Sequence, residues 1–198
     1  MIYLVRHGET EWNVARRMQG RQESRLTPRG ERQAAAMAGL LADLIACEAP
    51  AAWRLVSSPL GRARQTAAAI AARLGLPIEL DERLAEIAFG EWEGRLRDEV
   101  APQHPEVFAT REWLVSPPGG ETFDEVWARV SAWLADQPPE PERRVIAVSH
   151  GVTGRILRGV YAGLSRQETL MQDVPQDAVF RLIQGQVHRF DCEPLEDA

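Results

Sequence analysis

Lysine is absent from this sequence, because all 23 of the residues that are lysine or arginine are arginine. This absence excludes a Walker-type phosphate loop, a Schiff-base lysine and any catalysis that needs a lysine ammonium group. Any phosphate chemistry in this chain therefore depends on arginine, histidine and backbone amides.

Cysteines and long apolar runs are also scarce. The two cysteines, Cys47 and Cys192, are far apart and lack the spacing of a metal site. No apolar run approaches the length of a membrane span, and the segment between Met1 and Arg6 is too short for a signal peptide. The net charge of −6, without a basic stripe, disfavours a nucleic-acid-binding surface. We therefore expect a reduced cytoplasmic protein that binds neither nucleic acid nor membrane.

The hydrophobic pattern alternates between strand-like and helix-like segments. A chain of 198 residues with 44% hydrophobic content is long enough for one domain with a substantial core. The apolar runs at 2–5 and 145–149 are typical of buried strands in a parallel sheet. Further strands are expected at 53–57 and 77–80, and a hairpin at 179–183 and 186–190. The sequence thus predicts a single-domain α/β fold.

Helix starts are marked by capping residues. Thr27 and Ser58 each precede a proline, an order typical of an N-cap followed by the first helical residue. Thr122 and Glu125 form the pattern of a capping box. Residues 95–120 contain four prolines between short charged fragments, and we interpret them as a flap over one end of the sheet.

Two histidines follow two of the predicted strands at the points where these strands end. Arg6 and His7 follow the first strand, and His150 and Gly151 follow the strand at 145–149. Ligands bind at the carboxyl ends of parallel strands, so the two histidines should be neighbours. Arginine presents a planar fork of donors to phosphate or carboxylate oxygens, and a neutral histidine can act as a nucleophile.

Three further polar residues are candidates for the same site. Arg62 lies in the first turn of the helix after the strand at 53–57, beside a helix N-terminus that favours anions. Glu86 has apolar neighbours, and a carboxyl group in such surroundings tends to keep its proton, as a general acid must. Asn13 lies in a segment expected to be an irregular loop, where it either donates to an anion or caps a turn.

Four motifs occur in order between Met1 and about Tyr161. They are Arg6-His7-Gly8-Glu9-Thr10 with Trp12-Asn13, Ser57-Ser58-Pro59-Leu60 with Arg62-Ala63, Leu84 with Glu86, Phe89-Gly90 and Trp92-Glu93-Gly94, and Ser149-His150-Gly151. Together they resemble the histidine phosphatase superfamily, whose members are similar to phosphoglycerate mutase.

This resemblance implies a three-layer α/β/α sandwich around a mostly parallel sheet, in a single domain over residues 1–190 with a flap at about 95–120 and a short tail at 191–198. It implies a small phosphorylated metabolite as substrate, with no metal and no cofactor, and a homodimer is compatible with it. It implies His7 as the phosphorylated nucleophile, Glu86 as the proton donor, and a phosphoryl clamp of Arg6, Arg62 and His150, with Asn13 and Gly151 as further phosphate contacts.

Three functions fit these expectations: a phosphomonoester phosphatase with a phosphohistidine intermediate, a cofactor-dependent phosphoglycerate mutase, and a non-catalytic phosphate-binding module. The intact set of site residues argues against the third. A mutase must keep water away from its phosphoenzyme, and the segment from Gly94 to Thr122 is short for that purpose. The prediction is therefore a phosphatase.

Relatives act on sugar phosphates, phosphoserine and α-ribazole phosphate, and the sequence does not select among them. His104 is expected to be exposed, and neither it nor His188 is assigned a role.

Overall fold

The computed structural model describes residues 1–49 and 52–193. Its sheet has six strands in the order β3-β2-β4-β1-β5-β6. The parallel strands are β1 (Ile2–Arg6), β2 (Arg54–Ser57), β3 (Ile78–Leu80) and β4 (Val145–Ser149). Strands β5 (Ala178–Ile183) and β6 (Gln186–Asp191) add an antiparallel hairpin next to β1. The predicted mostly parallel sheet is confirmed.

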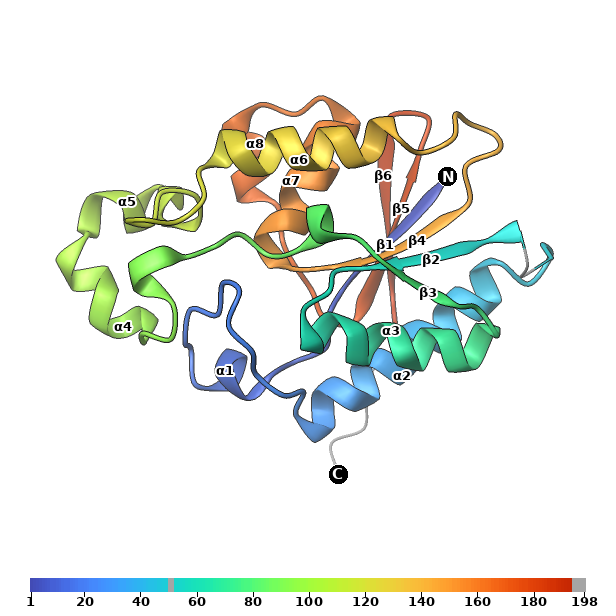
Figure 1. Ribbon diagram of the computed structural model, residues 1–198, viewed down its shortest axis with the longest axis horizontal. Helices are drawn as coiled ribbons and strands as arrows, with labels where there is room; N and C mark the ends of the chain where they lie inside the picture. Colours follow the sequence, from blue (N-terminus) through green and yellow to red (C-terminus); the bar gives the residue numbers. More distant parts are fainter. Residues whose placement is uncertain (50–51, 194–198) are drawn as a thin grey trace.

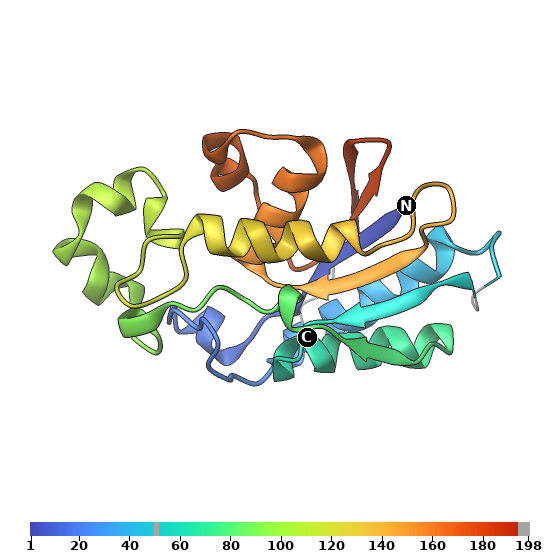
Figure 2. The ribbon, with the colours of Figure 1, turned by 45° about the horizontal axis from the view of Figure 1, so that its top comes forward.

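Helices cover both faces of this sheet (Figures 1 and 2). They are α2 (Pro28–Leu44) and α3 (Gly61–Leu74) on one face, and α6 (Phe123–Ala135) and α7 (Gly151–Ala162) on the other. Alternate residues of β1 pack into different clusters, because successive side chains of a strand point to opposite faces. Tyr3 and Val5 join the apolar cluster of α2 and α3, whereas Ile2 and Leu4 join that of α6 and α7. The fold is the expected three-layer α/β/α sandwich.

Two of the three predicted helix starts are confirmed. The Thr27 hydroxyl accepts a hydrogen bond from the Gly30 amide at 3.0 Å, and Thr122 and Glu125 complete a capping box. The third prediction is wrong, because α3 begins at Gly61 after Leu60 and has no side-chain cap. The Ser58 hydroxyl is instead 2.7 Å from His150 Nε2, so a tertiary contact uses the group that was expected to cap the helix.

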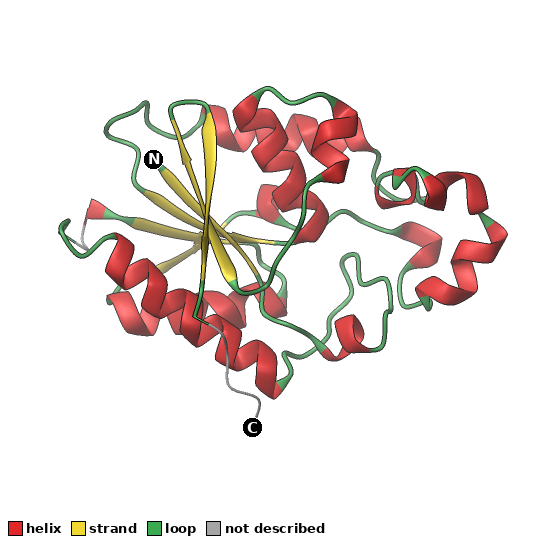
Figure 3. Ribbon diagram, turned by 180° about the vertical axis from the view of Figure 1, so that it is seen from behind, coloured by secondary structure: helices red, strands yellow, loops and turns green. Residues whose placement is uncertain are grey.

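Short helices occupy the segment that we interpreted as a flap. They are α4 (Arg97–Val100), a 3-10 helix (Ala101–Gln103), α5 (Pro105–Ala109) and a second 3-10 helix (Glu112–Leu114). Figure 3 shows them at one end of the molecule, away from α2 and α3. The prediction that His104 is exposed is wrong: the residue is half-buried, with its ring centroid 5.1 Å from that of Trp92, which is itself in the core.

Four short helices of the described residues lie in segments where none was predicted. They are α1 (Glu11–Val14), α8 (Arg166–Met171) and the 3-10 helices Glu82–Leu84 and Gly90–Trp92. Of the tail expected at 191–198, Asp191 ends β6, and residues 194–198 lie outside the described residues. Across residues 1–49 and 52–193, none of the helices combines the length and the apolar character that crossing a membrane requires.

Candidate active site

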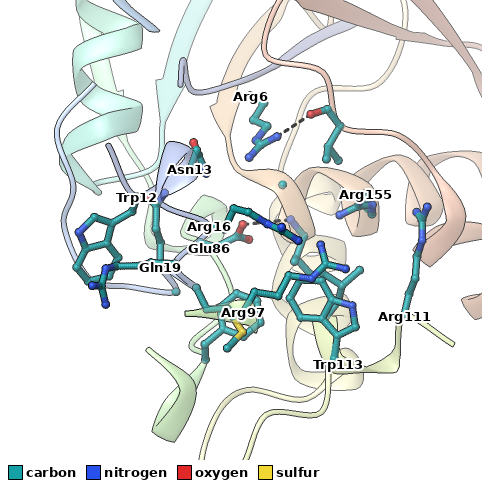
Figure 4. Close-up of a pocket in the computed structure, with 18 of the residues that line it drawn as sticks. Arg6, Trp12, Asn13, Arg16, Gln19, Glu86, Arg97, Arg111, Trp113 and Arg155 are labelled. Carbon is teal, nitrogen blue, oxygen red and sulfur yellow. Dashed lines mark hydrogen bonds between the residues drawn. The ribbon is translucent and has the colours of Figure 1, made fainter. Parts of the chain in front are cut away.

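A cavity of about 540 Å³ lies at the carboxyl end of β1, between the central sheet and the short helices of residues 97–114 (Figure 4). Its charged lining consists of one carboxylate, Glu86, and seven arginines: Arg6, Arg16, Arg17, Arg62, Arg97, Arg111 and Arg155. The protein carries a net charge of −6, yet seven of its 23 arginines line this cavity. Such a cavity attracts anions through its local field.

The structure brings the predicted site residues together. Six of them line the cavity: Arg6, His7, Asn13, Arg62, Glu86 and Gly151. His150 is buried beside it, with its ring centroid 5.2 Å from that of His7. The two histidines are neighbours because β1 pairs with β4 in parallel, with Arg6 opposite Ser149.

The two ring nitrogens of His7 have different partners. Nδ1 is 2.8 Å from the Gly8 carbonyl oxygen, which can only accept, so Nδ1 carries the proton and donates it. Nε2 is 3.3 Å from Arg62 Nε, which can only donate, so Nε2 accepts. The unprotonated nitrogen of His7 is therefore the one that faces the Arg62 guanidinium. A nucleophile requires such an unprotonated nitrogen.

Both histidines are held in the neutral form. Burial lowers the pKa of His7 well below 6.5, and the charges of Arg62 and Arg6 lower it further. Burial, followed by the charge of Arg62, likewise lowers the pKa of His150. Because these pKa values are depressed in the folded state, the neutral rings contribute stability above pH 6.5 that is lost as the pH falls below it.

We therefore expect His7 and His150 to remain neutral at pH 5.5, about one unit below the ordinary histidine pKa. The measurement is a pH titration of the ring ¹⁵N signals in the ligand-free protein, with His7 assigned by its loss in His7→Ala. A His7 ring that becomes protonated between pH 6 and 7, close to the ordinary histidine value, would contradict the assigned state.

Arg62 and Arg6 are oriented by backbone carbonyls. Arg62 is 1% exposed and donates to the carbonyls of Gln22 at 2.8 Å and Gly20 at 2.7 Å. Arg6 donates to the Val174 carbonyl at 2.7 Å. Burial lowers the pKa of Arg6 to about 10, so it is still a cation at neutral pH. No carboxylate of the described residues forms a salt bridge with either guanidinium. The pair is suited to an external anion.

Glu86 is oriented by the first turn of α7. Its Oε2 accepts from the Val152 amide at 3.1 Å, and its Oε1 accepts from the Thr153 amide at 3.0 Å and the Ile87 amide at 3.1 Å. A Cβ on Gly151 would lie 3.6 Å from Oε2 and 3.7 Å from Arg6 Nε. Because Gly151 has no side chain, space remains between the Glu86 carboxyl group and the Arg6 guanidinium.

The structure shows one of the two roles that the sequence left open for Asn13, namely that of a turn cap. It is the third residue of α1, where its amide N–H donates to Thr10 Oγ1 and its Oδ1 accepts from the Thr10 amide, both at 3.1 Å. Oδ1 also accepts from Gln176 Nε2 at 2.9 Å. The side-chain oxygen of Asn13 is therefore occupied, and its NH₂ group is the one left to donate to a ligand.

His150 is in contact with Ser58. Ser58 Oγ accepts from the Leu60 amide at 3.3 Å and lies 2.7 Å from His150 Nε2. His150 Nδ1 is buried and has no hydrogen-bond partner among the described residues.

Several lining residues were missed by the sequence analysis, notably Arg97, Arg111 and Arg155. Arg155 lies four residues after Gly151 on one helix, and this spacing could have placed both on the same face. Arg97 and Arg111 reach the cavity only because residues 97–114 fold against it, and no local pattern indicates that contact. Of the residues that the structure describes, none form a group of three or more histidine, cysteine or acidic side chains arranged to hold a metal ion.

Known proteins are similar to this chain in sequence and in fold. The model of the histidine phosphatase superfamily (branch 1) matches residues 2–193. The "probable phosphoglycerate mutase GpmB" of Enterobacter sp. (strain 638) is 39% identical over 170 residues, which cover 82% of this chain and 75% of that protein. A mycobacterial glucosyl-3-phosphoglycerate phosphatase is 30% identical, with a TM-score of 0.76 and coverage of 91% of this chain and 92% of that one. YhfR of Bacillus stearothermophilus is 32% identical, with a TM-score of 0.77 and coverage of 94% and 93%. This chain belongs to the histidine phosphatase superfamily, the family that its four motifs resemble.

Proposed function

We propose that this protein is a phosphomonoester phosphatase that acts on a small phosphorylated metabolite, through a phosphohistidine intermediate and without a metal ion. The observation that carries the proposal is the state of His7, whose unprotonated Nε2 faces the guanidinium of Arg62. Membership of the superfamily supports phosphoryl transfer. The likeness to a glucosyl-3-phosphoglycerate phosphatase supports hydrolysis.

In the first step the phosphoryl group binds among Arg6, Arg62 and the Asn13 NH₂ group. His7 Nε2 attacks phosphorus in line, so an N–P bond forms while the ester P–O bond breaks. Glu86 protonates the leaving oxygen through Oε2, the oxygen with a single protein donor. Phosphoryl transfer depends mainly on positioning and on stabilising charge, and the arginines can do both.

In the second step water attacks the phosphohistidine. The Glu86 carboxylate, having given up its proton, accepts one from this water as the N–P bond breaks. Inorganic phosphate leaves, and His7 returns to its neutral form with Nε2 unprotonated. Glu86 therefore donates a proton in the first step and accepts one in the second.

The alternative function is that of a phosphoglycerate mutase, which the similarity to GpmB favours. A mutase has to shield its phosphoenzyme from water. Here the wall formed by residues 97–114 is made of short helices, and several lining residues are exposed, among them Arg16, Arg97 and Ala109. The cavity that His7 lines is therefore open to solvent on the side of these residues, which supports hydrolysis.

Supplied with 3-phosphoglycerate and a trace of 2,3-bisphosphoglycerate, the protein is expected to release phosphate without forming 2-phosphoglycerate. EDTA should leave the rate unchanged, because the proposed chemistry uses arginines in place of a metal ion. p-Nitrophenyl phosphate serves as the control for general phosphatase activity.

Efficient isomerisation with little phosphate release would support the mutase. Activity that EDTA removes and Mg²⁺ or Zn²⁺ restores would exclude the metal-independent mechanism. Phosphate binding without turnover of any ester would favour the non-catalytic module.

A further inference from the structure

A buried hydroxyl group lies beside the carboxyl group of Glu86. Thr153 is fully buried in the first turn of α7, and its Oγ1 is 3.1 Å from Glu86 Oε1. The same Oγ1 is 2.8 Å from the carbonyl oxygen of Ala85. A hydroxyl group has one hydrogen, so it can donate fully to only one of these oxygens at a time. Thr153 therefore has two alternative acceptors, and one of them is Glu86.

A third neighbour of Thr153 Oγ1 cannot accept this hydrogen. Arg129 Nη2 lies 3.5 Å from Oγ1, and a guanidinium only donates. Arg129 is itself held in place, because its Nε donates to Glu121 Oε1 at 3.0 Å and its Nη1 donates to the Arg83 carbonyl at 2.6 Å. A donor on this side of Oγ1 leaves the hydroxyl hydrogen to the two acceptors named above.

The amide contacts of Glu86 indicate which of its oxygens carries the proton in the neutral form. Oε1 accepts from the amides of Thr153 at 3.0 Å and Ile87 at 3.1 Å, so a proton on Oε1 would lie against two amide hydrogens. Oε2 accepts from the Val152 amide alone among the described residues. The proton of the neutral carboxyl group is therefore better placed on Oε2. The Glu86 side chain lines the cavity, so this proton is available to a ligand there (Figure 4).

We propose that Thr153 is a positioning residue for Glu86. Its hydroxyl donates to the Ala85 carbonyl while Glu86 is neutral, and it turns to Oε1 when Glu86 gives up its proton. Thr153 keeps its own hydrogen throughout. The proton that is transferred leaves Glu86 Oε2 for the oxygen of the breaking ester P–O bond. The inference rests on the proposed function, because it takes Glu86 as the proton donor.

The turn of the Thr153 hydroxyl favours proton transfer. A hydrogen bond to a charged acceptor is about twice as strong as one to a neutral acceptor. The bond to Oε1 therefore gains strength as the Glu86 carboxylate forms, whereas the bond to the Ala85 carbonyl does not. Such a donor stabilises the transition state more than the ground state, which is the condition for raising the rate.

The test measures how kcat/KM depends on the leaving group. The probes are glycerol 3-phosphate, phenyl phosphate and p-nitrophenyl phosphate, whose leaving groups need the proton in decreasing order. In Thr153→Val, kcat/KM for glycerol 3-phosphate is expected to fall on the order of 10-fold, because a hydrogen bond to a developing carboxylate is lost. The value for p-nitrophenyl phosphate should change little, and that for phenyl phosphate should fall by an intermediate factor.

Two variants separate the hydroxyl from the shape of the side chain. Thr153→Ser keeps the hydroxyl and should restore most of the wild-type ratio of kcat/KM between glycerol 3-phosphate and p-nitrophenyl phosphate. Thr153→Ala lacks the hydroxyl and should give the ratio of Thr153→Val. Equal losses on all three probes in Thr153→Val, or a Thr153→Ser variant with the ratio of Thr153→Val, would mean that Thr153 serves packing alone and would overturn the proposal.

Thr169→Val is the matched control for losing a buried threonine hydroxyl. Thr169 is as buried as Thr153, and its side chain packs against Gly159 of α7, where a Cβ would collide with it. It does not line the cavity. Its replacement should leave kcat/KM for all three probes at the wild-type value.

Infrared difference spectroscopy of the ligand-free protein tests the proposal without turnover. Acid–base difference spectra contain the C=O band of the neutral Glu86 carboxyl group and the antisymmetric band of its carboxylate, both assigned by their loss in Glu86→Gln. Thr153→Val is expected to shift the carboxylate band and to leave the C=O band in place, because the hydroxyl donates to Oε1 only in the ionised state. Two unchanged bands, or equal shifts in both, would overturn the proposal.

The two measurements distinguish the failure of this inference from the failure of the proposed function. Hydrolysis of the esters with the wild-type ratio retained in Thr153→Val would overturn the role of Thr153 and leave the phosphatase proposal standing. A shift of the carboxylate band alone, in a protein that hydrolyses none of the esters, would support the role of Thr153 and reject the phosphatase proposal.

Discussion

Replacing His7 with alanine is expected to abolish the phosphoenzyme and to reduce kcat on the order of 10⁴- to 10⁶-fold, the range seen when a catalytic nucleophile is removed. The cations of Arg6 and Arg62 would still bind phosphate, but no nitrogen would be left in line with phosphorus. Rapid quenching with ³²P-labelled substrate should give a label on wild-type protein that is labile in acid and stable in alkali. The His7→Ala variant should show none.

His188→Ala is the matched control for this experiment. His188 is half-buried on β6, opposite Arg181 of β5, and does not line the cavity. Its replacement should leave both labelling and turnover at the wild-type level. A label found on serine or aspartate, or a label retained by His7→Ala, would exclude His7 as the nucleophile.

Replacing Glu86 with glutamine is expected to affect alkyl phosphates far more than aryl phosphates. An alkoxide needs a proton as it leaves, and a general acid typically contributes about 10²- to 10⁴-fold. A nitrophenolate leaving group is stable without that proton, so the loss of kcat/KM for an aryl phosphate should be small. The measurement is kcat/KM for glycerol 3-phosphate and p-nitrophenyl phosphate in the wild type and in Glu86→Gln.

Glu91→Gln controls for the loss of one negative charge nearby, because Glu91 is exposed in the 3-10 helix Gly90–Trp92. The amide of Glu86→Gln also changes the contacts with the Val152 and Thr153 amides, so the unfolding temperature of each variant should be recorded. Equal losses on the two substrates, in a variant that is folded, would mean that Glu86 is not the proton donor.

Local sequence patterns were sufficient where the interacting groups are close in the chain. Thr27 caps α2 and Thr122 caps α6, because each cap contacts an amide three residues away. The same reasoning failed at Ser58, whose hydroxyl bonds to a histidine 92 residues away. Asn13 was ambiguous because its side-chain oxygen serves the local turn and the residue also lines the cavity, and only the fold shows both.

The sequence by itself determined the α/β class, the central strands and the two strand ends that carry Arg6, His7 and His150. Hydrophobic periodicity and the direction of parallel strands are enough for that result. Only the tertiary structure decided which nitrogen of His7 is unprotonated, which amides hold Glu86, and that Arg97, Arg111 and Arg155 share a cavity with them. These features depend on contacts such as His7 with Arg62, 55 residues apart, and Glu86 with Thr153, 67 residues apart. Contacts over such separations form only when the chain packs as a whole, because neither partner changes the local conformational preference of the other.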